Sequence, residues 1–170
     1  MTATPEQFDT IAEIVQKARV AMVTTVTTEG ELVSRPLAMQ DRVFDGELWF
    51  FTEHPSPKTD DITADPHVNV AVAADDDYVS LSGKAAVSRD RTMIEGLWNK
   101  HAEAWFEGGI DDPAVALLHV KVDTAEYWKM DSPKIVTAAK YVAAIVTGKQ
   151  PDVGENETVA IEETPVSRPD

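Results

Sequence analysis

The sequence predicts a mainly β (α+β) fold, an antiparallel barrel of six or seven strands with flanking helices. Short β-branched and apolar runs recur along the chain, and turn signals such as Asp45-Gly46 separate them. Few segments show helical spacing, and 170 residues with 43% apolar content can form one core. No repeat suggests a second domain, so residues 1–148 are predicted to form the domain and 149–170 a disordered acidic tail.

The N-terminal third is predicted to contain one helix and three strands. Thr4 and Gln7 fit a capping box, and apolar residues at helical spacing then continue the helix to about Lys17 or Arg19. Strands are expected at 20–27 and 32–40, the second at a sheet edge or bulge because Pro36 cannot donate a ladder hydrogen bond. The Asp-Gly turn is expected to lead into a third strand, so that the three strands form an antiparallel meander.

The rest of the domain is predicted from similar signals. A helix over 56–64 ends at Asp65-Pro66 and is followed by two strands around an aspartate turn, the second bulged at Gly83. Helical pieces then follow from Asp90 to Phe106. The two strands around the aspartate turn span 68–74 and 78–87. Further expected elements are strands at 114–122 and 126–130 and a helix over 134–147.

Ser56-Pro57-Lys58 opens the second helix and admits two interpretations. Ser is a preferred N-cap and Pro a preferred first helical residue, so Ser56 can simply cap the helix while Lys58 is a solvated lysine. A helix start also offers unpaired N–H groups and a positive dipole end, and a lysine beside them would suit a phosphate dianion. Arg35, on the strand with Pro36, is a second candidate phosphate ligand; its simpler role is an ordinary edge-strand ion pair.

Composition excludes several classes of function. The chain has 15 basic and 30 acidic residues, a net charge of -15, which disfavours nucleic acids and anionic membranes as partners. There is no cysteine, so disulfides and thiolate metal sites are excluded, and the four histidines lack metal-ligand spacing. No apolar run is long enough to span a bilayer and no signal sequence is visible, so a cytoplasmic protein without a metal is the default expectation.

Several motifs, taken together, resemble a known family. They are Ser34-Arg35-Pro36-Leu37, residues 45–52, Ser56-Pro57-Lys58, residues 78–83, Asp90-Arg91, Leu97-Trp98, residues 104–106 and residues 126–128. In order and spacing, over roughly residues 5 to 148, they resemble the general stress protein branch of the pyridoxamine 5'-phosphate oxidase-like, FMN-binding split-barrel superfamily.

The resemblance implies a split β-barrel homodimer with FMN in two clefts at the interface. Arg35 would contact the phosphate, and Ser56 and Lys58 would close on it. The Pro36-Leu37 backbone would lie along the isoalloxazine ring, and the Phe51-Thr52 backbone would contact its polar edge. Three further aromatic residues are carried over as cofactor contacts, some of which the other subunit would supply: Tyr78, Trp98 and Trp128.

The resemblance leaves the reaction open. Leu37 stands where family members often have methionine, and the C-terminal substrate motif of true pyridoxamine 5'-phosphate oxidases is not recognisable, so vitamin B6 oxidation is not expected. No residue is identified as catalytic, although Trp98, Trp105 and Phe106 could wall a planar ligand instead of packing in a core. The alternatives are a flavin-dependent oxidoreductase with a small-molecule electron donor and acceptor, a non-enzymatic flavin-binding or storage protein, and a barrel that binds a deazaflavin, haem or an apolar ligand instead.

Overall fold

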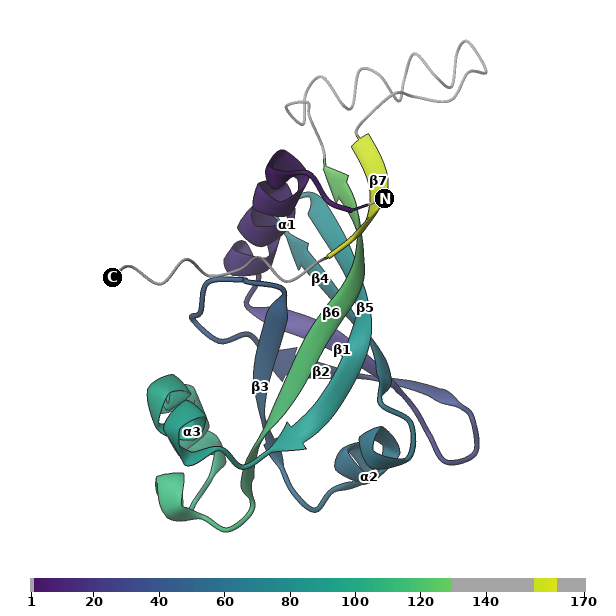
Figure 1. Cartoon of the computed structure of the whole chain (residues 1–170). Helices are drawn as coiled ribbons and strands as arrows, with labels where there is room; N and C mark the ends of the chain where they lie inside the picture. The colour runs from purple at the N-terminus through teal and green to yellow at the C-terminus, as the bar shows by residue number, and fades with distance from the viewer. Residues whose placement is uncertain (1, 130–154, 162–170) are drawn as a thin grey trace, which may run out of the picture.

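A single antiparallel sheet, strongly curved, forms the body of the protein (Figure 1). The computed structural model describes residues 2–129 and 155–161. The helices are α1 (Pro5–Lys17), α2 (Pro57–Ala64), α3 (Arg91–Leu97) and α4 (Lys100–Trp105), with one 3-10 turn at Gly109–Asp111. The strands are β1 (Val20–Val26), β2 (Leu32–Ala38), β3 (Glu47–Glu53), β4 (His67–Ala74), β5 (Asp77–Ser88), β6 (Val115–Lys129) and β7 (Glu155–Ala160).

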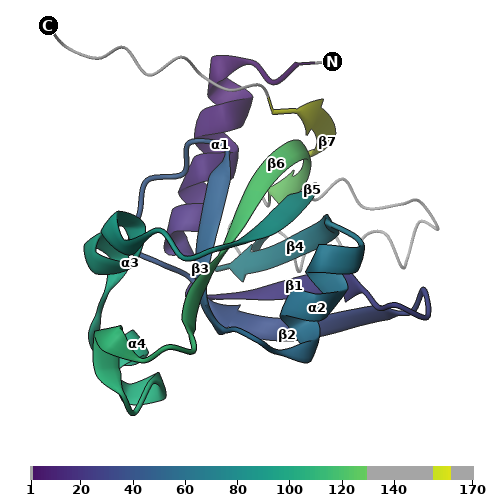
Figure 2. The same cartoon turned by 60° about the horizontal axis from the view of Figure 1, so that its bottom comes forward.

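The strand order is β2-β1-β4-β5-β6-β3, and β7 also pairs with β6. The prediction of an antiparallel, mainly β fold with six or seven strands and flanking helices is confirmed. In the part of the chain that the structure describes, β2 and β3 stand at opposite ends of this order and share no ladder. Within the described residues β2 and β3 approach each other without pairing, so the curved sheet has an opening in its hydrogen-bond ladder between these two end strands, as a split barrel does (Figure 2).

The predicted meander of the first three strands is wrong, because β3 pairs with β6 and not with β2. The Asp45-Gly46 turn does not form a hairpin between neighbours; Gly46 adopts a φ of 97°, and its carbonyl accepts a hydrogen bond from Val122 on β6. The turn therefore directs the chain towards β6. The predicted edge position of Pro36 is confirmed, because β2 pairs with β1 alone.

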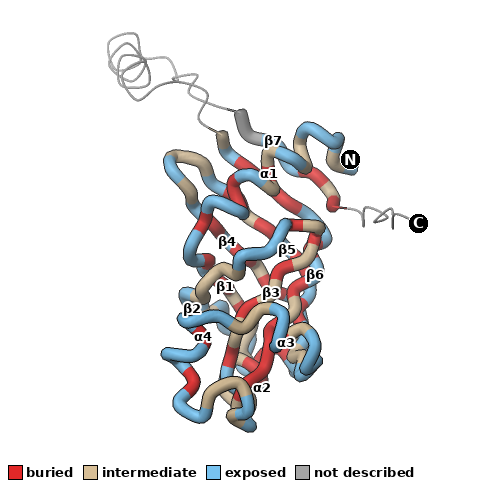
Figure 3. The backbone as a smooth tube through the Cα atoms, turned by 90° about the vertical axis from the view of Figure 1, so that its left-hand side faces the viewer, coloured by how far each residue is buried: buried red, intermediate tan, exposed pale blue. Residues whose placement is uncertain are grey.

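The main hydrophobic core lies on the concave side of the sheet. Side chains alternate between buried and exposed along β1, β4 and β5, which gives the banded pattern in Figure 3. Helix α1 closes one end of the barrel, as its capping box and apolar face predict, and buries Ile11, Ile14 and Val15. Burial of this apolar surface, at about 25 cal/mol per Å², is the main stabilising contribution to the fold.

A second, smaller core lies outside the barrel and holds the α3–α4 segment against β3 and β6. Its buried members are Ile94, Phe106, Val115 and Leu117. Phe51 and Trp98 pack against these residues. The rings of Phe51 and Trp98 meet edge to face, with their centroids 5.5 Å apart. This cluster fixes α4 beside the opening between the two end strands.

The described residues test two further sequence predictions. The irregularity predicted at Gly83 is confirmed by a register shift between Ser82 and Gly83, where the extra residue is Asp123 on β6. The two strands expected at 114–122 and 126–130 are one continuous strand, β6, which bends and pairs with β3 along its first half and β7 along its second. The helix predicted over 134–147 lies outside the described residues.

Part of the segment assigned to the acidic tail is ordered. Glu155–Ala160 forms β7, and Val159 and Ile161 are buried in the main core. The prediction of disorder is wrong for this stretch because its apolar residues complete the end of the barrel beside α1. None of the helices within residues 2–129 and 155–161 is both long and apolar enough to cross a membrane.

Candidate functional site

The start of α2 is built as the sequence predicts. Ser56 is the N-cap, and its Oγ accepts a hydrogen bond from the Thr59 N–H while the Thr59 Oγ1 accepts one from the Ser56 N–H. Because Pro57 has no N–H, the Lys58 N–H is the one first-turn donor left without a hydrogen bond to residues 2–129 or 155–161. The capping role of Ser56 is therefore confirmed, and a single backbone donor remains for a ligand.

Arg35 reaches from the edge strand β2 to the underside of α2. Its Nη1 donates to the Thr25 Oγ1 at 2.8 Å, and its Nη2 lies 3.2 Å from the Asp61 Oδ2. Both partners are buried: Thr25 is fully inaccessible and Asp61 is 7% exposed. Arg35 is therefore an ion-paired edge-strand arginine, one of the two roles that the sequence allowed, and its partner lies on the helix that Ser56 opens.

Lys58 lies close enough to Arg35 for the two charges to interact. Burial lowers the pKa of the Lys58 ammonium below its ordinary 10.5, the Arg35 charge lowers it further, and the Glu53 carboxylate acts in the opposite direction. Within the described part of the chain, no hydrogen bond or ion pair satisfies this ammonium. The Arg35–Lys58 site thus brings two cations together against one buried carboxylate, in a chain whose net charge is -15.

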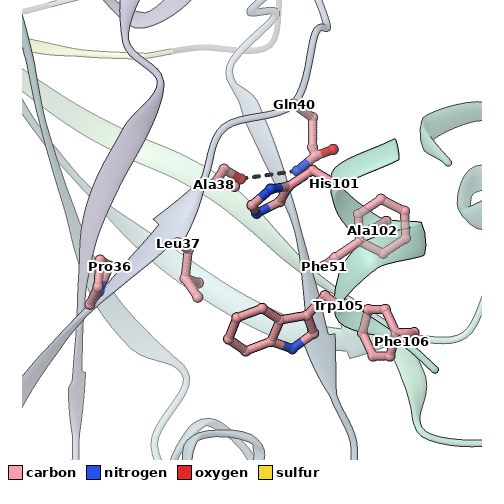
Figure 4. A pocket seen from close by; sticks show the side chains of 9 residues that line it. All are labelled: Pro36, Leu37, Ala38, Gln40, Phe51, His101, Ala102, Trp105 and Phe106. Carbon is pink, nitrogen blue, oxygen red and sulfur yellow. Dashed lines mark hydrogen bonds between the residues drawn. The ribbon is translucent and has the colours of Figure 1, made fainter. Parts of the chain in front are cut away.

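Next to this site, a pocket of about 100 Å³ opens between β2, β3 and α4 (Figure 4). Three of its lining residues are predicted site residues: Pro36, Leu37 and Phe51. The other lining residues are Ala38, Gln40, His101, Ala102, Trp105 and Phe106. The pocket is apolar for the most part, and Trp105, 66% exposed, forms an aromatic wall at its mouth.

Hydrogen bonds hold α4 over the pocket. The Asn99 Oδ1 caps α4 by accepting from the N–H groups of His101 and Ala102, and its Nδ2 donates to the Gln40 Oε1 at 2.9 Å. Gln40 in turn donates to the Ala38 carbonyl at 3.0 Å, the dashed line in Figure 4. The pocket wall is therefore tied to the end of β2.

The remaining predicted residues fall into two groups. Thr52 is buried on β3, where it is the register partner of Ala116 on β6. Trp98 does not line the pocket but packs edge to face on Phe51, which does. Tyr78 and Trp128 are directly opposite each other on β5 and β6, far along the strands from the pocket. One chain therefore does not bring Tyr78 and Trp128 to the same place as Arg35 and Lys58.

Tyr78 and Trp128 instead belong to an uncharged patch on the outer side of the sheet. Register places Tyr78 opposite Ala73 and Trp128, and Met22 opposite Ala71. Large apolar side chains on this side are unusually accessible: Val20 is 52% exposed, Met22 42%, Tyr78 51% and Trp128 37%. We call Val20, Met22, Ala71, Ala73, Tyr78 and Trp128 the outer sheet patch. A wider hollow borders this patch at Val20 alone and shares Pro36 and His101 with the lining of the pocket.

Sequence reasoning missed three of the residues that build this region. Asp61 looks like an ordinary acidic residue of a surface helix, and its contact with Arg35 spans 26 positions. Gln40 and His101 carry no local signal for a pocket, because their proximity depends on how the α3–α4 segment folds back. Of the two interpretations of the aromatic residues, packing in a core describes Trp98 and Phe106, which belong to the second core, while Trp105 and Phe106 also line the pocket.

Comparisons with known proteins give a consistent result. The family model described as "Pyridoxamine 5'-phosphate oxidase like" matches residues 6–152. Protein bli-3 of Neurospora crassa is 28% identical over 170 residues, which covers 93% of this chain and 81% of that protein.

Solved structures agree in fold. A crystal structure named as general stress protein 26, from Jannaschia sp. CCS1, has a TM-score of 0.73 and 24% identity, covering 92% of this chain and 99% of that one. The general stress FMN/FAD binding protein of Xanthomonas citri has a TM-score of 0.67 and 28% identity, covering 76% of this chain and 93% of that one.

Proposed function

The chain belongs to the pyridoxamine 5'-phosphate oxidase-like family, with general stress proteins among its structural relatives, and from this premise we propose that it binds FMN. The phosphate would lie between Arg35, Lys58 and the start of α2, and the isoalloxazine ring along Pro36-Leu37 and the Phe51-Thr52 backbone. The name of the Xanthomonas citri relative, an FMN/FAD binding protein, supports a flavin as the ligand class.

One observation carries this proposal: the partly buried Lys58 ammonium, whose charge interacts with that of Arg35, forms no ion pair or hydrogen bond within the described residues, and the Glu53 carboxylate offsets the Arg35 charge only from a distance. Two like charges in a partly desolvated site are unfavourable without an anion between them. A terminal phosphate with a charge of about -2 satisfies both, with a fork of donors from Arg and a point charge from Lys. The donor set therefore fits the phosphomonoester of FMN better than the diester of FAD or the neutral end of riboflavin.

The ring would occupy the apolar side of the site. The pocket wall of Leu37, Phe51 and Trp105 offers flat, uncharged surface to a planar ligand. Because β3 ends the strand order, alternate backbone groups around Phe51 face away from β6 and could meet the polar edge of a ring.

We also propose that the protein is a homodimer that packs through the outer sheet patch. An uncharged, aromatic patch is unusual on a chain of net charge -15, and its contact with a second copy would remove Val20, Met22, Tyr78 and Trp128 from water. Since the hollow beside the pocket reaches the edge of this patch at Val20, a second copy packed on the patch could bring its Tyr78 and Trp128 towards the ring. Sedimentation should show a dimer that Met22→Asp dissociates. Val43→Asp, at an exposed loop valine away from the patch, is the matched control and should not dissociate it.

FMN, when bound, would supply electron transfer between a reduced donor and an acceptor, and the chain would bind and orient it and exclude water from one side of the ring. On this basis we propose a flavin-dependent oxidoreductase. The competing proposal is a non-enzymatic flavin-binding protein. It is favoured by the scarcity of acid–base groups, since His101 is the one titratable side chain among the pocket-lining residues.

Two measurements test these proposals. The visible absorption spectrum of the purified protein, before and after addition of FMN, should show a bound flavin; a colourless protein that ignores FMN would overturn the flavin proposals and favour a deazaflavin, haem or apolar ligand. Anaerobic mixing of the FMN complex with NADH and NADPH should bleach the flavin if the protein is an oxidoreductase. A flavin that no donor reduces would favour the binding role.

A further inference from the structure

Asp61 is a buried carboxylate that the proposed function does not use directly. It lies on α2, is 7% exposed, and faces the sheet and not the solvent. Its Oδ2 accepts from the Arg35 Nη2 at 3.2 Å and from the Thr25 Oγ1 at 3.3 Å. A carboxylate is costly to bury and remains buried only when it is paired and hydrogen-bonded, so this triad is a built arrangement of the fold.

We propose that Asp61 is a positioning residue that, with Thr25, holds Arg35 facing Lys58 and so makes the site selective for flavins that end in a phosphate. This inference rests on the proposed function. It extends it by assigning the discrimination of FMN from riboflavin to a residue that would not touch either ligand.

The hydrogen-bond inventory of Arg35 supports this role. A guanidinium carries five N–H donors, and Arg35 donates one hydrogen bond to Thr25 and one to Asp61. Three donors remain for an anion, and their direction is fixed because the two occupied donors lie on different Nη atoms. An arginine held at two points loses less conformational entropy when it binds a phosphate than a free one does.

Charge balance supports the same role. Lys58 and Arg35 repel each other in a partly desolvated site, and the Asp61 carboxylate offsets the Arg35 charge from the side that the ligand cannot reach. The two cations can therefore stay together before the ligand arrives. If Asp61 instead chiefly repelled the phosphate, removal of its charge would tighten FMN binding.

The test compares FMN with riboflavin, which shares the ring but lacks the phosphate. Dissociation constants are measured by flavin fluorescence for the wild type, Asp61→Asn and the matched control Asp60→Asn, which removes the same charge from an exposed position on the same helix. We expect Asp61→Asn to weaken FMN by about tenfold, the scale of one displaced charge-assisted hydrogen bond, and riboflavin by less than about twofold. Asp60→Asn should change neither.

Two further variants secure the result. Thr25→Val keeps the shape of a buried strand residue but removes the hydroxyl, and should weaken FMN selectively by about threefold, a neutral-bond effect. It also tests the proposal if Asp61→Asn does not fold. In an Arg35→Ala background, Asp61→Asn should cause no additional loss of FMN affinity, because Asp61 acts through Arg35.

The outcomes separate this inference from its premise. A wild type that binds neither flavin overturns the proposed function, and one that binds both equally overturns the phosphate placement. A wild type that prefers FMN, with the same preference in Asp61→Asn and Thr25→Val, overturns the role of Asp61 alone. Tighter FMN binding by Asp61→Asn, or equal losses for both flavins, would also overturn it.

Discussion

The two ends of the candidate site are built in opposite ways. At the Arg35–Lys58 end, Thr25 and Asp61 hold Arg35 at defined distances, Lys58 is near enough for its charge to interact with Arg35, and the ligand would be selected by its charge. At the pocket end, Leu37, Phe51 and Trp105 present apolar surface, and α4 is held there by a separate small core and by the Asn99–Gln40 hydrogen bond. The first end would select a ligand by charge, whereas the second would select by shape.

This difference gives a rule for variants. Changes at the Arg35–Lys58 end should distinguish FMN from riboflavin, because only FMN carries the phosphate. Changes in the pocket should affect both flavins alike, because their rings are the same.

The largest effect is expected at the two cations. Arg35→Ala or Lys58→Ala should weaken FMN binding by about 1.5–3 kcal/mol each, roughly 10- to 150-fold, because each removes charged hydrogen bonds to the phosphate. Riboflavin binding should stay within about twofold. Calorimetric titration of both flavins measures this, with Lys17→Ala, at an exposed lysine of α1, as the control of equal charge change. Unchanged FMN affinity in both variants would show that the phosphate is placed wrongly.

A smaller and less selective effect is expected in the pocket. Trp105→Ala should weaken FMN and riboflavin by the same factor, about 2- to 10-fold, since it removes an aromatic contact of about 0.5–1.5 kcal/mol. Trp105→Phe should restore most of the loss. Fluorescence titrations of both flavins measure the two factors. A loss confined to FMN would contradict the division between the ends, and no change in either would place the ring elsewhere.

The sequence predicts the two ends unequally, for a physical reason. The cap at Ser56 and the edge position of Pro36 depend on local backbone chemistry, so a few neighbouring residues are enough to predict them. The partnership of Arg35 with Asp61, and the wall that His101 contributes, depend on contacts between distant segments. Hydrophobic periodicity does not predict such contacts, because the local sequence around an acidic helix residue is the same whether that residue faces solvent or a buried arginine.

The same limit explains the errors in the fold. The meander was the local solution for three strands joined by turns, but β3 pairs with β6, about 70 residues further along the chain. Likewise, Val159 and Ile161 are too few to mark a strand within an acidic segment, and only the open edge of β6 makes β7 favourable. Cofactor contacts of Phe51, Thr52, Tyr78, Trp98 and Trp128 remain predictions.

The pH dependence of FMN binding should report the cationic end alone. The pKa of Lys58 in the free protein is lowered by burial and by Arg35, and a bound phosphate would raise it again, so FMN binding is linked to proton uptake by Lys58. Affinity for FMN should therefore fall as pH rises through the lowered pKa of free Lys58 towards the ordinary 10.5. Riboflavin controls for titration of the ring.

Lys58→Arg provides the matched control for that dependence, because arginine stays protonated throughout this range. Its FMN affinity should be nearly flat over the same pH interval, with Arg35 and Glu53 unchanged as the charged neighbours of the site. An FMN affinity of the wild type that rises with pH, or falls equally for riboflavin, would contradict the assignment to Lys58.

The smallest effect concerns the stability of the ligand-free protein. A cation that is half-buried without a partner costs folding free energy, so Lys58→Met should raise the unfolding midpoint at pH 7 by about 1–3 °C. Because the folded-state pKa of Lys58 lies below its ordinary 10.5, the cost is full at lower pH and disappears as pH rises through that folded value towards 10.5. The gain from Lys58→Met should shrink over the same interval.

Lys17→Met is the control: Lys17 is paired with Glu13, which raises the Lys17 pKa, so its loss should give no gain. Thermal melts followed by circular dichroism measure both. If Lys58→Met lowered the unfolding midpoint instead, Lys58 would stabilise the ligand-free fold, which would contradict the interpretation of Lys58 as an unpaired cation that destabilises the free protein.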